Sequence, residues 1–143
     1  MSILTAASQL SAWRGYEYWQ EKRVLRCTKT GEGEYEGLVS GSAPQPYLVK
    51  LRLDHPRTST CTCPHAAGRR VVCKHMVALY FTAFPQQAQE YAAWIEESER
   101  EEEERARELY RQVEKYVYSL SKEELRQMLI RYILEMEQCG GYW

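Results

Sequence analysis

The chain has 143 residues, of which 44% are hydrophobic and 27% charged, a composition typical of a globular domain and not of a disordered chain. No stretch approaches the roughly 20 consecutive apolar residues that a membrane-spanning helix needs, and the first residues lack the basic and apolar regions of a signal peptide. We therefore expect a soluble, cytoplasmic protein. The cysteine count of five is odd, which argues against a fully paired secreted framework and favours metal binding.

The net charge of −1 conceals a division along the sequence. Residues 1–85 contain 11 Lys and Arg against 6 Asp and Glu, whereas residues 86–143 contain 8 against 14. An overall charge near zero argues against a protein that is strongly basic throughout. The basic first part is nevertheless suited to an anionic partner, and the acidic second part is not.

Short elements are predicted in the first 53 residues. A loosely helical spacing of apolar residues predicts a short helix over Thr5–Glu21, interrupted at Gly15. Alternating apolar residues and turn signals then predict three strands, at Val24–Thr28, Tyr35–Val39 and Tyr47–Leu53. Together these strands predict a small antiparallel meander.

Helical patterns dominate the rest of the chain. Residues Cys73–Phe84 are apolar enough for a largely buried helix, which Pro85 should end or interrupt. A second helical run, Gln87–Leu120, contains the segment Glu96–Arg105, which is polar on every side. We interpret that segment as a solvated helical arm in which the helix can kink or break.

The last helix has clear start and stop signals. Ser121 as N-cap and Glu124 three residues later form a capping box, with Leu120 and Leu125 in the hydrophobic-staple positions, and Gly140-Gly141 ends the helix. Apolar residues then recur along one face, which we interpret as an internal packing face and not as a partner-binding one. That stripe consists of Leu125, Met128, Leu129, Tyr132, Ile133 and Met136.

Two pairs of metal-ligand residues lie close together in the sequence. Cys61 and Cys63 are one residue apart, so in an extended chain both sulfurs face the same side. Cys73 and His75 repeat that spacing after a loop of nine residues, which is short enough to keep the closure entropy small. With His75 in the first turn of a helix, the two pairs predict a Cys3His site for one structural Zn²⁺.

Other chemistries compete with zinc at these positions. A disulfide within the first pair would close a very tight ring, iron–sulfur clusters prefer four cysteines, and four free thiols would leave His75 a coincidence. His65 is the one rival ligand, but it does not reproduce the spacing of the first pair. Of the remaining cysteines, we expect Cys27 to be a buried thiol in a strand and Cys139 to be a free thiol.

The pattern C-x-C-x9-C-x-H, followed at once by an apolar helix, resembles the SWIM zinc finger. The resemblance covers roughly residues 12–84. It is carried by Arg14-Gly15-Tyr16-Glu17-Tyr18, Val39-Ser40-Gly41-Ser42, Tyr47-Leu48-Val49, Cys61-Thr62-Cys63-Pro64 and Cys73-Lys74-His75. It implies that Cys61, Cys63, Cys73 and His75 are the zinc ligands. Such domains are described as binding DNA or proteins, and they accompany helicase, transposase and recombination-mediator chains.

These observations predict an α+β fold in two parts. We expect a SWIM-type zinc-binding domain with an N-terminal helix in residues 1–85, in which a small antiparallel meander and a Cys3His site lead into a helix. Residues 86–143 are expected to form a helical tail, made of the acidic helix and the capped amphipathic helix. No helicase or transposase portion accompanies the pattern, so those activities are not carried over to this chain.

Catalysis is not expected. A catalytic zinc keeps an open position for water, whereas three thiolates and one imidazole fill all four positions of the predicted site. The sequence also lacks the G-x-S-x-G, P-loop and H-E-x-x-H motifs. We therefore expect a protein that acts by binding.

The first binding hypothesis is a protein-interaction adaptor or a subunit of a larger, DNA-processing complex. The zinc domain would be a small platform, and the helical tail would dock onto a protein partner. Tyr142 and Trp143, after Gly140-Gly141, would anchor that contact, since aromatic residues dominate interface energetics.

The alternative is direct binding of DNA or RNA through the zinc-finger loop. A basic rim would contact phosphates, with Tyr47 or Trp19 stacking on bases. The rim consists of Arg57, Arg69, Arg70 and Lys74. The same cations would also neutralise the zinc-bound thiolates, so the sequence leaves this hypothesis open.

Overall fold

The computed structural model of the chain describes residues 2–138, and its contacts divide it into two compact units, Met1–Ala93 and Trp94–Trp143. The sequence placed the boundary at residue 85. The first unit extends beyond that point because Ala88 is fully buried and the ring of Tyr91 lies 5.4 Å from that of Phe81. No helix in the described part of the chain combines the length and apolarity that crossing a membrane requires.

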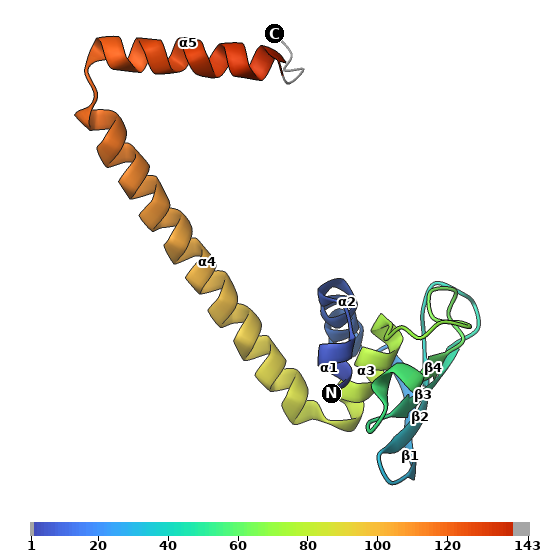
Figure 1. Cartoon of the computed structure of the whole chain (residues 1–143). Coiled ribbons are helices and arrows are strands. Elements are labelled where there is room, and N and C mark those ends of the chain that lie inside the picture. Colours follow the sequence, from blue (N-terminus) through green and yellow to red (C-terminus); the bar gives the residue numbers. More distant parts are fainter. Residues whose placement is uncertain (1, 139–143) are drawn as a thin grey trace. The chain divides into compact units, whose positions relative to one another are not determined.

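One antiparallel sheet forms a layer of the first unit, with its strands in the order β1-β2-β3-β4 (Figure 1). The strands are β1 (Val24–Gly31), β2 (Glu34–Val39), β3 (Tyr47–Arg52) and β4 (Thr60–Cys61). This confirms the predicted α+β class and the meander. The two-residue strand β4 was not predicted, because it is too short for a periodic pattern; pairing of Cys61 with Val49 aligns it on β3.

The helix α3 (Lys74–Ala83) packs between the sheet and the N-terminal helices, and it contributes more of the largest fully buried side chains than any other element. The N-terminal helices are α1 (Ile3–Ala6) and α2 (Gln9–Gln20), and a 3-10 turn, η1 (Pro56–Thr58), follows the sheet. The largest fully buried side chains come from α1, β2, β3, α3 and the N-cap of α3. They are Ile3, Val39, Val49, Leu51, Cys73, Met76, Val77, Leu79 and Phe81.

The predicted N-terminal helix is present as α2, but it starts at Gln9, follows a separate short helix α1, and is not interrupted at Gly15. The break lies at Ala7-Ser8, where Ala7 forms an isolated parallel bridge with Val72 and Ser8 caps α2 by accepting a hydrogen bond from the Ser11 amide at 3.1 Å. α2 runs through Gly15 because α3 lies directly against it. A Cβ at Gly15 would lie 2.4 Å from Cβ of Val77, so only glycine lets the two helices approach this closely.

The second unit contains most of α4 (Pro85–Ser119) and all of α5 (Lys122–Gln138). Pro85 interrupts the helical run as predicted, because it is the first residue of α4 and α3 has ended before it. α4 continues without a break through the polar segment. The predicted capping box is confirmed: the Ser121 amide donates to Glu124 Oε2 at 2.7 Å, and the Glu124 amide donates to Ser121 Oγ at 3.3 Å.

The apolar stripe of α5 does not form an internal packing face in the described chain, contrary to the prediction. Leu129 and Tyr132 are each 59% exposed, and Met136 is 42% exposed. The periodicity correctly indicated an amphipathic helix. It could not show what covers that face, since periodicity is a property of one segment and burial is a property of the whole assembly.

Gly15→Ala is expected to lower the free energy of unfolding by about 1–3 kcal/mol, because the added methyl group would collide with Val77 and with the Lys74 carbonyl of α3. Urea unfolding followed by circular dichroism measures this change. Gly31→Ala is the matched control, since its methyl group would meet only the flexible Glu34 side chain. Equal effects of the two substitutions would contradict the close approach of α2 to α3.

Candidate metal centre

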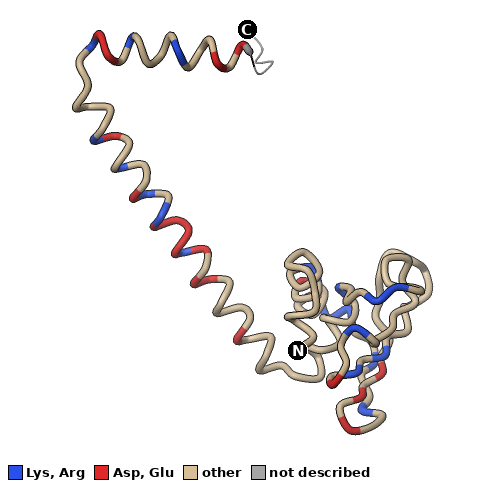
Figure 2. Tube along the Cα trace, in the orientation of Figure 1, with Lys and Arg blue, Asp and Glu red and all other residues tan. Residues whose placement is uncertain are grey.

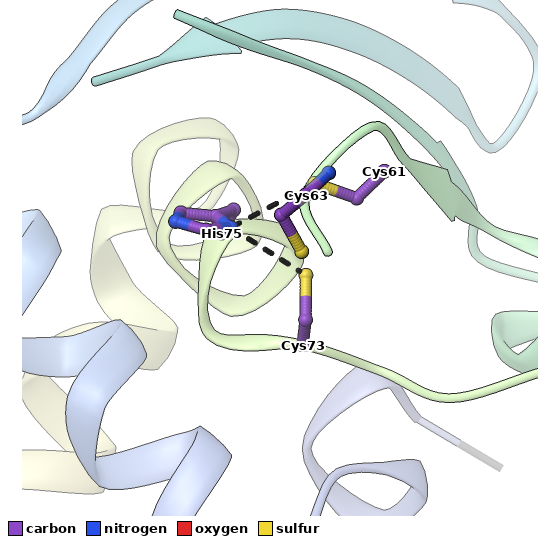
Figure 3. A group of neighbouring side chains, drawn as sticks. All are labelled: Cys61, Cys63, Cys73 and His75. Carbon is purple, nitrogen blue, oxygen red and sulfur yellow. Dashed lines mark hydrogen bonds between the residues drawn. The ribbon is translucent and has the colours of Figure 1, made fainter. Parts of the chain in front are cut away.

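The four predicted ligands come together at the junction of the sheet and α3. Cys61 ends β4 and Cys63 lies in the turn that follows, whereas Cys73 is the N-cap of α3 and His75 is in its first turn. All four residues, called the zinc cluster below, are at most 4% exposed. Figure 3 shows their side chains converging on one point from these two segments.

The spacing of the ligand atoms fits a single small ion. The candidate ligand atoms of the zinc cluster all lie within 4.8 Å of one another. His75 Nδ1 is 3.7 Å from Sγ of Cys61 and 3.8 Å from Sγ of Cys73. Tetrahedral zinc with Zn–S near ~2.3 Å and Zn–N near ~2.0–2.1 Å requires ligand separations of about 3.5–3.8 Å. Nδ1 is therefore the imidazole atom placed to ligate.

The protein alone stabilises a thiolate at one of the three sulfurs. The Cys61 thiol donates a hydrogen bond to Cys73, which lowers the pKa of Cys73 to about 4. His75 also lowers this pKa, whereas burial raises it. The same hydrogen bond, together with burial, raises the pKa of Cys61, and burial raises the pKa of Cys63. A bound dication would favour all three thiolates at once, which is the chemistry of this donor set.

The residues therefore fit one structural zinc ion, held by the zinc cluster. Four protein ligands fill the tetrahedral coordination of zinc and leave no position for a substrate. Such a site contributes to folding, with apparent binding free energies of about 10–16 kcal/mol for small zinc modules at neutral pH. Its role here is to join β4 and the following turn to the start of α3.

Aromatic rings and a glycine hold the His75 imidazole in place. The ring of Tyr47 lies 4.7 Å from that of His75, and the ring of Tyr18 lies 5.4 Å away on α2. His75 Nε2 faces away from the sulfurs and is buried without a hydrogen-bond partner among the described residues. A Cβ at Gly41 would lie 3.1 Å from Nε2 and 2.3 Å from the Tyr47 ring, so glycine is needed beside the imidazole.

The sequence of residues 47–84 matches the SWIM zinc finger family, and this segment contains the whole zinc cluster, β3, β4 and α3. The chain contains a SWIM zinc finger. A SWIM zinc finger is a binding module and does not belong to a catalytic family. No curated protein and no solved structure matches the chain significantly.

The other predicted histidine and cysteine residues lie outside the zinc cluster. His65, the rival ligand, is exposed in the turn between the ligand pairs and does not join the cluster. Cys27 is a half-buried free thiol on β1, and burial raises its pKa. Cys139 lies outside the described residues, as do Tyr142 and Trp143.

The structure brings most of the predicted basic rim to two adjoining grooves beside the SWIM finger. Lys74 lines the first groove with Arg14, and Arg57 lines the second with Arg70; His65 lines both. Arg69 lines neither groove, although it is exposed in the same loop. The residues Arg14, Arg57, Arg70 and Lys74 are called the zinc-side cations below.

The proposed stacking residues are held in the fold. Tyr47 is only 8% exposed, because it packs on His75, so the prediction that it stacks on a base is wrong. Trp19 is half-buried and its ring contacts Tyr16 and Phe81, at centroid distances of 5.7 Å and 6.3 Å.

Arg14 and Tyr18 are site residues whose role the sequence did not reveal. Arg14 lines the groove at the zinc cluster, and Tyr18 lies one helical turn later on α2. Lys74 Nζ sits 4.4 Å from the centroid of the Tyr18 ring, and the Arg23 guanidinium carbon sits 4.7 Å from it. Arg14 and Tyr18 are four residues apart, which places them on one face of α2. That spacing is the signal by which the sequence could have indicated that both belong to the site.

We expect the purified chain to contain one zinc ion and His75→Ala to lose it, whereas His65→Ala should keep it. The reason is that Nδ1 of His75 faces two cluster sulfurs, while His65 is exposed and lies apart from them. Elemental analysis of zinc per chain, with circular dichroism for folding, measures the outcome. Retention of zinc by His75→Ala together with loss in His65→Ala would reverse the ligand assignment.

Proposed function

We propose that this chain is a non-catalytic protein-interaction module, in which the SWIM finger is the folded platform and the helical tail binds a protein partner. The exposed apolar surface of the tail carries the proposal. No described residue from 94 to 137 is buried. Apolar surface of this extent, left uncovered on a soluble chain, is typical of a binding surface.

The C-terminal half of α4 supplies one continuous part of this surface. Its apolar residues, called the α4 stripe below, recur on one face of the helix and are partly or largely exposed. They are Ala106, Leu109, Tyr110, Val113, Tyr116 and Val117. Spacing of three and four residues places them on one side, which is the pattern that an amphipathic helix presents to a hydrophobic groove.

The acidic segment of α4 favours a partner with a basic surface beside that groove. Residues 96–104 contain seven Glu and one Arg, and Figure 2 shows the acidic residues gathered along this part of the helix. Ion pairs within the helix, such as Arg107 with Glu103 at 3.1 Å and Arg100 with Glu97 at 3.6 Å, leave most of these carboxylates unpaired. A basic protein surface would complement them.

The anchor predicted at Tyr142 and Trp143 belongs to the same proposal. Tyr142 and Trp143 follow the tail helices in the sequence and belong to the same unit as the α4 stripe. In this proposal one partner contacts both. Aromatic side chains bury a large apolar area at a small cost in conformational entropy, which suits them to a terminal anchor.

We expect Leu109→Ser/Val113→Ser to abolish capture of the partner from an extract of the native cell, because both side chains lie on the α4 stripe. Affinity capture with quantitative mass spectrometry measures this. Arg111→Ser/Lys115→Ser, on the opposite side of α4, is the matched control and should keep the partner. Deleting residues 140–143 should weaken capture, and capture that is unchanged by any of these variants would contradict the proposal.

Nucleic-acid binding is the second candidate function. It is favoured by the difference between most cations on the sheet, which form ion pairs, and the zinc-side cations, which do not. Three of the four cations on the sheet strands have carboxylate partners, Lys29 being the exception: Arg26 and Lys50 meet Glu36, at 3.5 Å and 3.4 Å, and Arg52 meets Glu34 at 3.2 Å. None of the zinc-side cations forms an ion pair with a described residue. Unpaired cations lining adjoining grooves suit phosphate groups.

For this candidate we expect Arg57→Ala/Arg70→Ala to weaken oligonucleotide binding and to reduce the slope of log K against log salt by about 1–2, because two phosphate contacts are lost. Fluorescence anisotropy of labelled single- and double-stranded oligonucleotides at several salt concentrations measures both quantities. Lys50→Ala/Arg52→Ala removes the same charge from ion-paired cations of the sheet and should have a smaller effect. Equal effects of the two pairs would indicate non-specific attraction to the whole basic unit.

A further inference from the structure

The imidazole of His75 has no protein partner for the hydrogen bond that normally orients a zinc-ligating histidine. Such a histidine almost always donates its second ring N–H to a carboxylate, a backbone carbonyl or water, which fixes the orientation of the ring. Here Nδ1 faces the sulfurs of Cys61 and Cys73, and Nε2 is buried with no hydrogen-bond partner among the described residues. His75 is only 3% exposed. The protein therefore has to orient this ring by packing.

Two tyrosine rings from different elements pack against the imidazole. The ring of Tyr47, on β3, lies 4.7 Å from it with 41° between the planes, and the ring of Tyr18, on α2, lies 5.4 Å away with 66° between the planes. Rings that approach at different angles oppose rotation of the imidazole, because rotation would break the packing with at least one of them. Tyr47 is fixed by its burial at the start of β3, whereas Tyr18 is half-buried and needs further contacts to stay in place.

Two cations supply those contacts to Tyr18. Lys74 Nζ lies 4.4 Å from the centroid of the Tyr18 ring, and the guanidinium carbon of Arg23 lies 4.7 Å from it. A cation within about 6 Å of an aromatic centroid is attracted by the quadrupole of the ring. Lys74 is the first residue of α3 and stands between the ligands Cys73 and His75. Its contact therefore ties the Tyr18 ring to the segment that carries two of the four ligands.

The turn that ends α2 brings Arg23 back to Tyr18. Lys22 has a φ of 55°, and its amide donates to the Trp19 carbonyl at 3.0 Å. The Arg23 amide donates to the Tyr18 carbonyl, also at 3.0 Å. These two hydrogen bonds form the Schellman motif that closes many helices. Arg23 also forms an ion pair with Glu21, so local structure sets its position beside the ring.

We propose that Tyr18 is a positioning residue of the metal centre, which together with Tyr47 takes the place of that hydrogen bond and keeps the His75 imidazole in the orientation in which Nδ1 binds zinc. Lys74 and Arg23 act through the Tyr18 ring, because they hold it beside the imidazole. Loss of the ring should not prevent zinc from binding, but it should let the ion leave sooner. This role belongs to the finger alone and does not depend on which partner the tail binds.

The rate of zinc release from the full-length, zinc-loaded chain to an excess of a chromogenic chelator tests the role of the ring. Tyr18→Leu keeps apolar bulk on α2 and should release zinc about tenfold faster, at the lower end of the cost of losing a partner of a metal ligand. Tyr18→Phe should stay within about twofold of the wild type, because the ring makes these contacts and the hydroxyl does not. A wild-type rate in Tyr18→Leu, or equally fast release from Tyr18→Phe, would overturn the proposal.

Trp19→Leu is the matched control for packing. Trp19 is the next residue of α2, it is half-buried, and its ring contacts Tyr16 and Phe81 and not the imidazole. This variant removes an aromatic ring from the core and should release zinc at close to the wild-type rate. Acceleration equal to that of Tyr18→Leu would show a general loosening of α2 and would overturn the specific role of Tyr18.

A double substitution tests whether Lys74 acts through the ring. Lys74→Met keeps the apolar stem and should speed zinc release about two- to fivefold in the wild type, but it should add nothing in the Tyr18→Leu variant. Arg57→Ala/Arg70→Ala removes charge from the second groove and should leave the rate unchanged. Additive effects of Lys74→Met and Tyr18→Leu, or equal acceleration by Arg57→Ala/Arg70→Ala, would overturn the link from Lys74 through Tyr18 to His75.

Discussion

The convergence of the zinc cluster is the constraint on which the finger depends. Cys61 and Cys63 belong to the end of β4 and its turn, and Cys73 and His75 belong to the start of α3. β4 has only two residues, so its few backbone hydrogen bonds to β3 cannot position this segment by themselves. One tetrahedral ion replaces a longer strand, because it connects the edge of the sheet to α3, the helix that contributes more of the largest buried side chains than any other element.

The packing around α3 follows from that connection. α3 touches the sheet on one side and α2 on the other, and small residues make both approaches short. Gly15 admits Val77, and Gly41 admits the Tyr47 ring beside His75. Tyr18 then lies between the imidazole and Lys74, so the helix α2 contacts the ligand and also positions a cation next to the zinc cluster. The metal centre and the basic grooves are therefore parts of one packed structure.

The two units of the chain differ in how far they bury their apolar residues. The first unit buries a core between α3 and the sheet, and its metal centre closes that core. The second buries none of its described residues, although α4 and α5 both carry apolar stripes. Helix propensity and ion pairs between neighbouring turns hold a helix only marginally in water, so such stripes are matched by packing against another surface. The tail therefore depends on packing against another surface for its stability, whereas the finger is stabilised by its own core and metal centre.

The zinc ligands, the meander, the capped last helix and the interruption at Pro85 could all be predicted from the sequence, because each depends on residues close together in the chain. Cys61, Cys63, Cys73 and His75 lie within fifteen residues, and the capping box spans four. Strand β4, the break before Ser8, the burial of Tyr47 and the exposure of the α5 stripe could not. Each of these depends on which distant segment lies opposite, and only the tertiary structure brings Val72 to Ala7, His75 to Tyr47 and α3 to Gly15. By itself the sequence determined what each segment can do locally, whereas the tertiary structure decided which apolar faces are covered and which cations stay unpaired, since burial and pairing are relations between segments.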